Sequence, residues 1–311
     1  MLPNFLIIGA MKAGTTSLYR DLGDHPDVFF PADKEPGNLA ADEVLGADGR
    51  RRYERRFARA RPGQRVGDAS TDYTKLPDIP GVPERARRTL GPDVRIVYMV
   101  REPVSRARSH HRHLLARGLA TADFEATLAA VPGLVGYGCF AEQVAPWMDA
   151  FSPEAVLVLR LEDYAADRFA AMTEVAAHLG LDRSTPLGSG GPADRSPASR
   201  SPANWSPAKR SPANRSSDTT PVTGWWTAVR DNPLYRRAVR PLLSGAARTR
   251  IRGVVLPPPP PPPGPPTPAT VAAMVARFGP DERRLRQLTG RTQPYWDFDA
   301  VVAAAERGGE A

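Results

Sequence analysis

The sequence predicts an α/β protein, a three-layer sandwich in which a central parallel sheet is flanked by helices. Apolar runs at 5–8, 94–100 and 155–159 have the length of buried strands and are too short for helices. Segments with helical spacing and end signals separate these runs. Short strands alternating with helices favour a parallel sheet whose two faces are both covered.

The first strand and the first helix enclose a glycine-bounded loop. Phe5-Leu6-Ile7-Ile8 is the strand, and a helix opens at Thr15, with Leu18 and Leu22 on one face. We expect Gly23 to end this helix in a left-handed cap. The loop runs from Gly9 to Gly14. A strand, such a loop and a helix N-terminus together form a typical phosphate-binding context, because backbone N–H groups converge there.

The other elements follow from the same periodicities. Extended segments are expected at 28–30 and 65–70, and Gly180 is expected to close the helix that precedes it. The aromatics of Tyr295-Trp296-Asp297-Phe298 are expected to seal the core. Helices are predicted over 42–62, 83–90, 103–115, 123–131, 139–151, 168–179, 270–278 and 281–288.

The loop departs from the nucleoside-triphosphate pattern G-x-x-x-x-G-K-[ST] in an informative way. Thr15 stands where that pattern has its lysine, and Lys12 lies inside the loop instead. The loop is therefore P-loop-like without the magnesium arrangement. We expect it to hold a phosphate through its amides and the hydroxyls of Thr15, Thr16 and Ser17, with Lys12 reaching the next group of the ligand and no metal involved.

A second anion site is predicted at the end of the strand 94–100. Arg101 stands at the carboxyl end of that strand, where open parallel sheets bind ligands. Ser105 and Ser109 share a face of the following helix. A guanidinium fork with a serine hydroxyl suits a second phosphate.

These pieces, in this order, resemble sulfotransferases that use 3′-phosphoadenosine 5′-phosphosulfate (PAPS), in particular the branch of heparan-sulfate sulfotransferases and bacterial relatives. Gly67-Asp68-Ala69-Ser70 with Tyr73 resembles an architectural segment of that family, with Asp in place of Glu. The resemblance implies catalytic roles for Lys12 and Glu35, and Glu35 would be the general base. The implied cofactor-binding residues are Lys12, Ala13, Gly14, Thr15, Thr16, Ser17, Arg101 and Ser109.

Two departures from the family bear on the site. The family continues after Glu35 with a His/Phe pair, whereas this chain has Pro36-Gly37-Asn38-Leu39. The late Lys-Gly-Arg loop of the family has no clear counterpart, with Arg252 or Lys209-Arg210 as the only stand-ins. His25 is the rival base, although its His-Pro turn favours a structural role. Of the histidines at 110, 111 and 113, we expect at most one to face the cofactor.

The function implied by the resemblance is transfer of a sulfuryl group from PAPS to a hydroxyl, or as second choice an amine, of a carbohydrate or small-molecule acceptor. The sequence leaves the acceptor and the oligomeric state open. Two other hypotheses compete with this one. One is a small-molecule kinase with an aberrant P-loop. The other is a non-enzymatic, basic nucleic-acid-binding protein, although no recognised binding module is visible.

Composition narrows the setting. The net charge of +8 over 311 residues favours anionic ligands such as nucleotides. The lone Cys139 excludes an internal disulfide and suits a reducing cytoplasm. We find no apolar run of about 18 residues and no signal peptide, so a cytoplasmic, bacterial-type enzyme with no membrane or nucleic-acid partner is expected.

Low-complexity segments divide the chain. Residues 1–183 form the predicted core with its cofactor-binding loops. Residues 184–217 repeat Ser-Pro-Ala every five residues and are predicted to be a disordered insert, or alternatively a flap over an acidic acceptor. A helical return to the core at 218–256, a polyproline spacer at 257–268 and a helical C-terminal part at 269–311 complete the predicted organisation.

Overall fold

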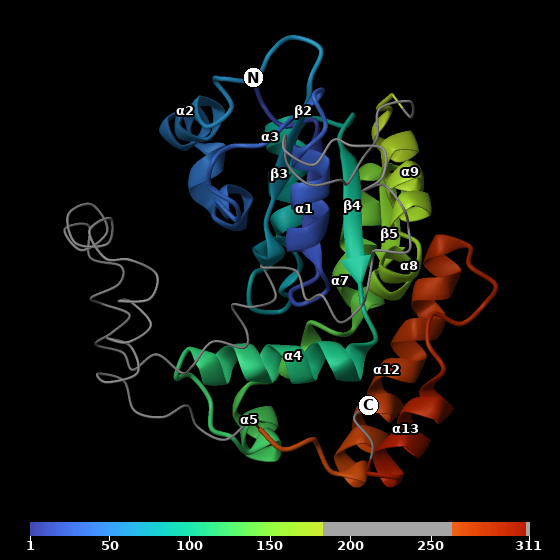
Figure 1. Ribbon diagram of the computed structural model, residues 1–311. Helices are drawn as coiled ribbons and strands as arrows, with labels where there is room; N and C mark the ends of the chain where they lie inside the picture. Colours follow the sequence, from blue (N-terminus) through green and yellow to red (C-terminus); the bar gives the residue numbers. More distant parts are fainter. Residues whose placement is uncertain (183–262, 309–311) are drawn as a thin grey trace, which may run out of the picture.

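A five-stranded sheet forms the centre of the protein, as a computed structural model that describes residues 1–182 and 263–308 shows (Figure 1). The strand order is β2-β3-β1-β4-β5, and every neighbouring pair is parallel. The predicted parallel α/β architecture is confirmed. The strands are β1 (Phe5–Gly9), β2 (Val28–Phe29), β3 (Arg65–Ala69), β4 (Arg95–Val100) and β5 (Val156–Arg160).

The central strand β1 pairs with β3 on one side and β4 on the other. Its Ile7 lies opposite Ala69 of β3 and Val97 of β4. All five residues of β1 are buried, as are the last five of β4, because helices cover both faces of the sheet. Since the strands are parallel, the carboxyl ends of β3, β1, β4 and β5 meet at one edge. Helix α4 (Pro103–Ala116) crosses beneath this edge in Figure 1.

The helices follow the predicted pattern closely. Helix α1 (Thr15–Gly23) is tied to two helices after β5, and α3 packs against α7. Gly180 ends α9 in the left-handed conformation, as expected. The remaining helices are α2 (Ala47–Arg55), α3 (Val82–Leu90), α5 (Phe124–Ala130), α6 (Gly133–Gly136), α7 (Phe140–Phe151), α8 (Leu161–Ala166), α9 (Arg168–Leu179), α12 (Pro268–Thr289) and α13 (Phe298–Glu306), with 3₁₀ turns η1 (Asn38–Ala40), η2 (Asp42–Leu45), η3 (Thr71–Thr74) and η4 (Pro153–Ala155).

Three helix predictions were wrong in detail. The helix expected over 42–62 is split by an extended Gly46 into η2 and α2, and Gly49 fits closely under η2, where a Cβ would lie 1.7 Å from the Glu43 carbonyl oxygen. Gly23 is the last residue of α1 but is not left-handed, since the cap residue Asp24 keeps a right-handed conformation. The two C-terminal helices are one, because α12 continues through Pro280.

Aromatic side chains of the C-terminal part pack into the core, as expected for them. Tyr295 and Trp296 are 3% and 7% exposed and belong to the main hydrophobic cluster. A second cluster joins α4, α5 and α12 through side chains that include Val104, Phe124 and Phe278. The insert 184–217, the helical return 218–256 and half of the proline spacer, residues 257–262, lie outside the described residues. Among the described helices, none is both long and apolar enough to cross a bilayer.

Candidate active site

The loop between β1 and α1 presents an uncapped helix N-terminus. Gly14 is the N-cap of α1, adopts φ +91° and offers no side chain to the first N–H groups of the helix. Those N–H groups therefore remain available to an anion. A Cβ on Gly14 would lie 2.6 Å from Cδ1 of Leu161, the first residue of α8. Backbone conformation and packing thus both require glycine here.

The two predicted anion sites adjoin one another. Lys12 lies in the loop with φ +69°, and Arg101 directly follows the neighbouring strand β4. The Arg101 guanidinium donates from Nη1 to the Lys12 carbonyl oxygen at 3.4 Å. The carboxyl ends of two adjacent strands thereby bring Lys12 and Arg101 into one region of the sheet edge.

Positive charges crowd this region. Burial lowers the pKa of Lys12, and the charges of Arg101 and Arg112 lower it further. Burial is also the main cause that lowers the pKa of Arg101, with Arg112 acting in the same direction and Glu162 against it. Cations held together in this way oppose one another's charge, and a bound anion would relieve that opposition.

One face of α4 completes the basic surface. Ser109 is 9% exposed and lies eight residues after Arg101, as predicted. Arg112 and His113 follow it by three and four residues, so they share its side of the helix. Sequence reasoning did not single out Arg112. Its position three residues after Ser109, on the same side of the predicted helix, is the sequence signal that could have identified it. Glu102 fixes the start of α4 by accepting hydrogen bonds from the N–H groups of Val104 and Ser105.

Glu35 lies at the end of β3, on the other side of β1 from Arg101. Its backbone N–H donates to the Ala69 carbonyl at 2.9 Å, and its φ is +62°. The Lys34 ammonium contacts Oε1 of Glu35 at 2.8 Å and donates to Oγ1 of Thr16 at 3.0 Å. With 44% of its side chain exposed, Glu35 remains accessible to an acceptor while Lys34 connects it to the loop.

The histidines have separate surroundings. His113 lies in the field of both Lys12 and Glu35; burial first, then Lys12, lowers its pKa to about 4, so the ring is neutral at pH 7. His110 stacks on Tyr137 at 5.8 Å, and His111 Nε2 contacts the Thr121 carbonyl at 2.8 Å. His25 is 1% exposed and accepts the Asp27 N–H at Nδ1, which is a structural role.

The segment at the end of β3 is architectural, as expected. Asp68 is fully buried, and its Oδ2 accepts hydrogen bonds from the hydroxyls of Tyr53 at 2.6 Å and Tyr73 at 2.7 Å. Burial raises the pKa of this carboxyl, while the two tyrosine hydrogen bonds oppose the shift. The carboxylate therefore anchors α2 and η3 to the sheet.

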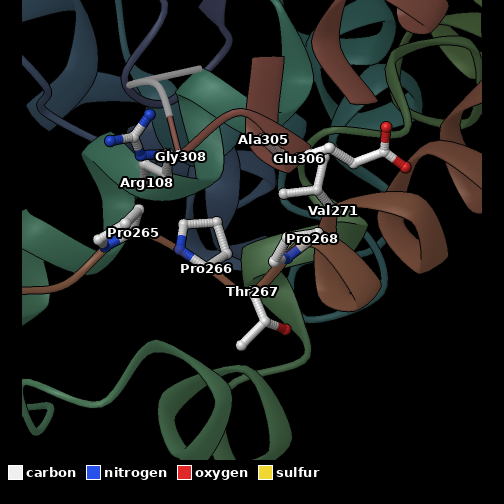
Figure 2. Close-up of a pocket in the computed structure, with 9 residues that line it drawn as sticks. All are labelled: Arg108, Pro265, Pro266, Thr267, Pro268, Val271, Ala305, Glu306 and Gly308. Atoms are coloured by element: carbon white, nitrogen blue, oxygen red, sulfur yellow. The ribbon is translucent and has the colours of Figure 1, made fainter. Parts of the chain in front are cut away.

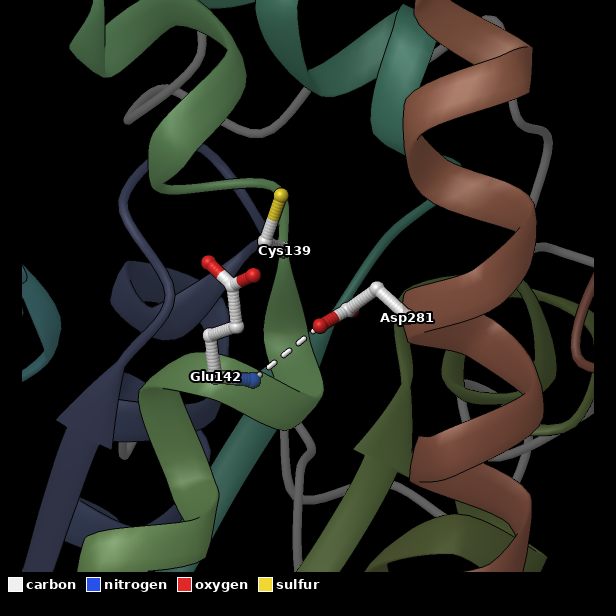
Figure 3. A group of neighbouring side chains, drawn as sticks. All are labelled: Cys139, Glu142 and Asp281. Atoms are coloured by element: carbon white, nitrogen blue, oxygen red, sulfur yellow. Dashed lines mark hydrogen bonds between the residues drawn. The ribbon is translucent and has the colours of Figure 1, made fainter.

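A group of Cys139, Glu142 and Asp281 has the spacing of metal ligands, but its contacts are those of a helix cap (Figure 3). Asp281 accepts the N–H groups of Ala141 at 3.0 Å and Glu142 at 3.1 Å, at the start of α7. Glu142 pairs with Arg277. Burial raises the pKa of the Cys139 thiol to about 12.

Two cavities lie outside the Lys12 loop. One, of about 280 Å³, is bounded by Arg108 of α4, by Val271 and by the residues at the end of α13, with prolines 265, 266 and 268 on its wall (Figure 2). The other, of about 640 Å³, lies at the carboxyl ends of β4 and β5 and is lined by Glu102, Arg160, Glu162 and residues 294–299 and 301.

Comparison with known proteins finds similarity to the family that the motifs resemble. Residues 83–191 match the model of the sulfotransferase domain family. This stretch contains Arg101 and Ser109 but neither the Lys12 loop nor Glu35. Mouse carbohydrate sulfotransferase 15 is 25% identical over 246 residues, covering 58% of this chain and 44% of that protein. Human heparan sulfate glucosamine 3-O-sulfotransferase 6 is 29% identical over 196 residues, covering 58% of this chain and 53% of that protein.

The chain thus spans about half the length of the curated relatives that it matches. A sulfotransferase from Alicyclobacillus acidocaldarius shares the fold, with a TM-score of 0.59 over 94% of this chain and 98% of that one, at 24% identity. The resemblance to the sulfotransferase family is therefore confirmed, by sequence over residues 83–191 and by fold over nearly the whole chain.

Proposed function

We propose that this protein transfers the sulfuryl group of PAPS to a hydroxyl of a carbohydrate or small-molecule acceptor, with an amine as the second choice. The observation that carries the proposal is the junction of Lys12 and Arg101 at adjacent strand ends, where the guanidinium contacts the Lys12 carbonyl. A nucleotide phosphorylated on both sides of its ribose needs two cation sites at such close range.

The residues present fit that nucleotide. The uncapped N–H groups of α1, the hydroxyls of Thr16 and Ser17, and the Lys12 ammonium offer donors to the 5′ side. Arg101 and Ser109 offer a fork and a hydroxyl to the 3′-phosphate. The opposed charges of Lys12, Arg101 and Arg112 also fit an anionic ligand, because such a ligand would relieve them.

In the proposed step, the acceptor oxygen forms a bond to sulfur while the bond from sulfur to the bridging phosphate oxygen breaks. Glu35 takes the proton of the acceptor hydroxyl, and the bridging oxygen leaves with the electron pair of the broken bond. Lys12 and the loop N–H groups stabilise the charge that grows on that oxygen, as preorganised donors do in other group transfers. Glu35 stands on the β3 side of the loop, so the acceptor approaches from that side.

A carbohydrate acceptor is supported by the names of the curated relatives, which act on carbohydrate and on heparan sulfate glucosamine. The polar side chains around Glu35 suit a strongly hydroxylated acceptor. Lys34 and Lys75 lie on this side, each paired with one carboxylate, and His113 adds a neutral ring. We place the reaction in the cytoplasm, where the buried free thiol of Cys139 stays reduced.

Calorimetry tests the donor. We expect 3′-phosphoadenosine 5′-phosphate to bind the wild-type protein equally well with and without Mg²⁺, and ATP to bind more weakly by at least tenfold. The kinase hypothesis predicts the opposite order and a requirement for Mg²⁺. Tighter binding of Mg·ATP would therefore overturn the proposal.

Glu35→Gln tests the base. We expect turnover to fall by about 10²–10⁴-fold, because the amide cannot accept the proton, while affinity for 3′-phosphoadenosine 5′-phosphate is unchanged. Glu84→Gln, an exposed carboxylate of α3 that is remote from the loop, is the matched control and should change neither quantity. Equal losses of turnover and nucleotide affinity in Glu35→Gln would contradict its role as base.

A further inference from the structure

Arg106 of α4 is a cation in the interior of the protein. Its side chain is fully buried, one helical turn before Ser109. The guanidinium donates from Nη2 to the Leu134 carbonyl oxygen, whereas Nε and Nη1 find no hydrogen-bond partner within residues 1–182 and 263–308. Arginine is almost never fully buried without a counter-charge, because burying a bare charge destabilises the fold.

The two polar groups that act most strongly on Arg106 are neutral at pH 7. These are the Tyr98 hydroxyl and the Cys139 thiol; burial raises the pKa of both, that of the thiol to about 12. Asp281, whose charge acts on Tyr98 and Cys139, accepts instead the two N–H groups at the start of α7. Within the described part of the chain, no carboxylate therefore pairs with the Arg106 guanidinium.

The buried cation lies close to the proposed 3′-phosphate site. Burial lowers the pKa of Arg106 to about 10, and the charge of Arg101, five residues earlier, adds to that shift. Ser109 follows Arg106 by three residues and shares its side of the helix. A phosphate held by Arg101 and Ser109 would therefore lie within about 10 Å of the buried guanidinium, or about two helical turns.

The charge of Arg106 also acts on its neighbours along α4. After burial, it is the next cause that lowers the pKa of His110 to about 3. A charge in the interior acts over such distances because the protein around it screens less than water does. The same field must act on an anion bound at the end of β4.

We propose that the bound 3′-phosphate is the counter-charge of Arg106, which attracts it through the protein without touching it. This inference rests on the proposed function. Two unit charges about 10 Å apart, at an effective dielectric constant of about 20, attract each other enough to change a binding constant by about tenfold. Arg106 thus raises the affinity for a nucleotide that carries a 3′-phosphate, and Arg101 and Ser109 make the contacts.

Two substitutions separate the charge of Arg106 from its hydrogen bond. Arg106→Gln removes the charge and keeps an N–H donor for the Leu134 carbonyl, whereas Arg106→Lys keeps both a charge and a donor. Arg88→Gln removes an exposed cation of α3 and is the matched control. Circular dichroism checks that each variant is folded.

Calorimetry with three nucleotides provides the test: 3′-phosphoadenosine 5′-phosphate, adenosine 3′-phosphate and adenosine 5′-phosphate. The two monophosphates carry the same charge and differ only in where the phosphate lies. We expect Arg106→Gln to weaken the bisphosphate and the 3′-monophosphate about tenfold, and the 5′-monophosphate by less than about threefold. Arg106→Lys should weaken each ligand by less than about threefold, and Arg88→Gln should leave all three affinities unchanged.

Salt provides a second readout. Dissolved ions screen exposed charges strongly and buried charges much less. The ratio of bisphosphate affinities between the wild type and Arg106→Gln should therefore stay the same between about 50 mM and about 300 mM sodium chloride, while both affinities fall. A ratio that falls to one at high salt would mean that the charge acts through solvent, which would overturn the inference.

The outcomes separate this inference from the proposed function. If the wild type binds the bisphosphate and Arg106→Gln leaves all three affinities unchanged or weakens them equally, Arg106 is not the partner of the 3′-phosphate and the phosphate sites stand. If the wild type binds none of the three, both proposals fail. Should Arg106→Gln not fold, Arg106→Met, also neutral, is measured with the same expectations. If neither neutral variant folds although Arg106→Lys does, the charge serves the fold and the inference is wrong.

Discussion

The two ends of helix α1 carry charge clusters of opposite kinds. At its C-terminal half, Asp21 is 1% exposed and is fully paired. It accepts the Tyr164 hydroxyl and two N–H groups of Arg168, one at 2.6 Å. At its N-terminal end, the guanidinium of Arg101 lies beside Lys12 and, after burial, is the next cause that lowers the pKa of that lysine.

The difference separates architecture from binding. The Asp21 cluster joins α1 to α8 and α9. The charges of Asp21 and Arg168 compensate each other, so the cluster stabilises the fold. The Lys12 cluster leaves like charges together at a strand edge and lowers pKa values there. Such an arrangement costs stability in the free protein and becomes favourable when an anion binds.

Breaking the Asp21 cluster should have the largest effect. Asp21→Asn leaves Arg168 without its buried counter-charge, so we expect the free energy of unfolding to fall by about 3–5 kcal/mol. Urea unfolding followed by circular dichroism measures this. The exposed Asp149→Asn on α7 is the matched control and should change the free energy of unfolding by less than about 0.5 kcal/mol.

Measuring the activity of Asp21→Asn tests whether the Asp21 cluster serves the fold alone. Turnover per folded molecule should remain at the wild-type level under conditions where Asp21→Asn is still folded. A large loss of turnover with unchanged stability would mean that the Asp21 cluster belongs to the site.

Removing Lys12 should have the opposite result: turnover should fall while the free energy of unfolding is kept. Lys12→Ala is expected to lower turnover by about 10²–10³-fold, or about 3–4 kcal/mol, because one donor to the leaving oxygen is lost. The free energy of unfolding should stay the same or rise, since the electrostatic repulsion between the Lys12 ammonium and Arg101 is relieved while the backbone carbonyl that Arg101 contacts is kept. Arg88→Ala, an exposed cation of α3, should alter neither. Wild-type turnover in Lys12→Ala would contradict the role proposed for this lysine.

A smaller effect is expected in the pH dependence of the free energy of unfolding, because one buried histidine of α4 is held neutral in the folded protein. Burial, then Arg106, lowers the pKa of His110 to about 3 in the folded protein, against about 6.5 when unfolded. The unfolded chain therefore binds this proton first, and stability is lost as pH falls from 6.5 toward 3. Between pH 7 and pH 5 the contribution of His110 is about 2 kcal/mol, at about 1.4 kcal/mol per unit.

Urea unfolding at the two pH values measures that loss, and His110→Gln should remove about 2 kcal/mol of it. His113, whose pKa is lowered to about 4, acts in the same direction and remains in the variant. An identical pH dependence in wild type and variant would show that His110 is not held neutral by its surroundings.

Sequence reasoning predicted the features that depend on local order. The loop between β1 and α1, the placement of Arg101 after β4 and of Ser109 on α4, and the parallel sheet all follow from short patterns with clear periodicity. The helix boundaries near 46 and 280 did not follow, because tertiary packing decided them. Gly49 accommodates the Glu43 carbonyl of η2, and α12 continues through Pro280 with Phe278 and Leu285 buried on its two sides.

The candidate site was harder to predict where it joins distant segments. Glu35 was identified only through the family resemblance. The structure adds its connection to Thr16 through Lys34, which no spacing in the sequence indicates. How the histidines at 110, 111 and 113 face Lys12 depends on the rotation of α4, on which His110 packs against Tyr137. The cavity beside Trp296 joins residues more than 130 positions apart.

The close packing of Leu161 on Gly14 limits how the sequence can change at either position. A side chain at position 14 would collide with Cδ1 of Leu161, so the loop after β1 and the turn after β5 cannot be altered independently. Enlarging residue 161 would push on the loop that carries Lys12, and trimming it would open a void behind that loop. Redesign of the residues that follow β5 would therefore have to preserve the shape of this one leucine.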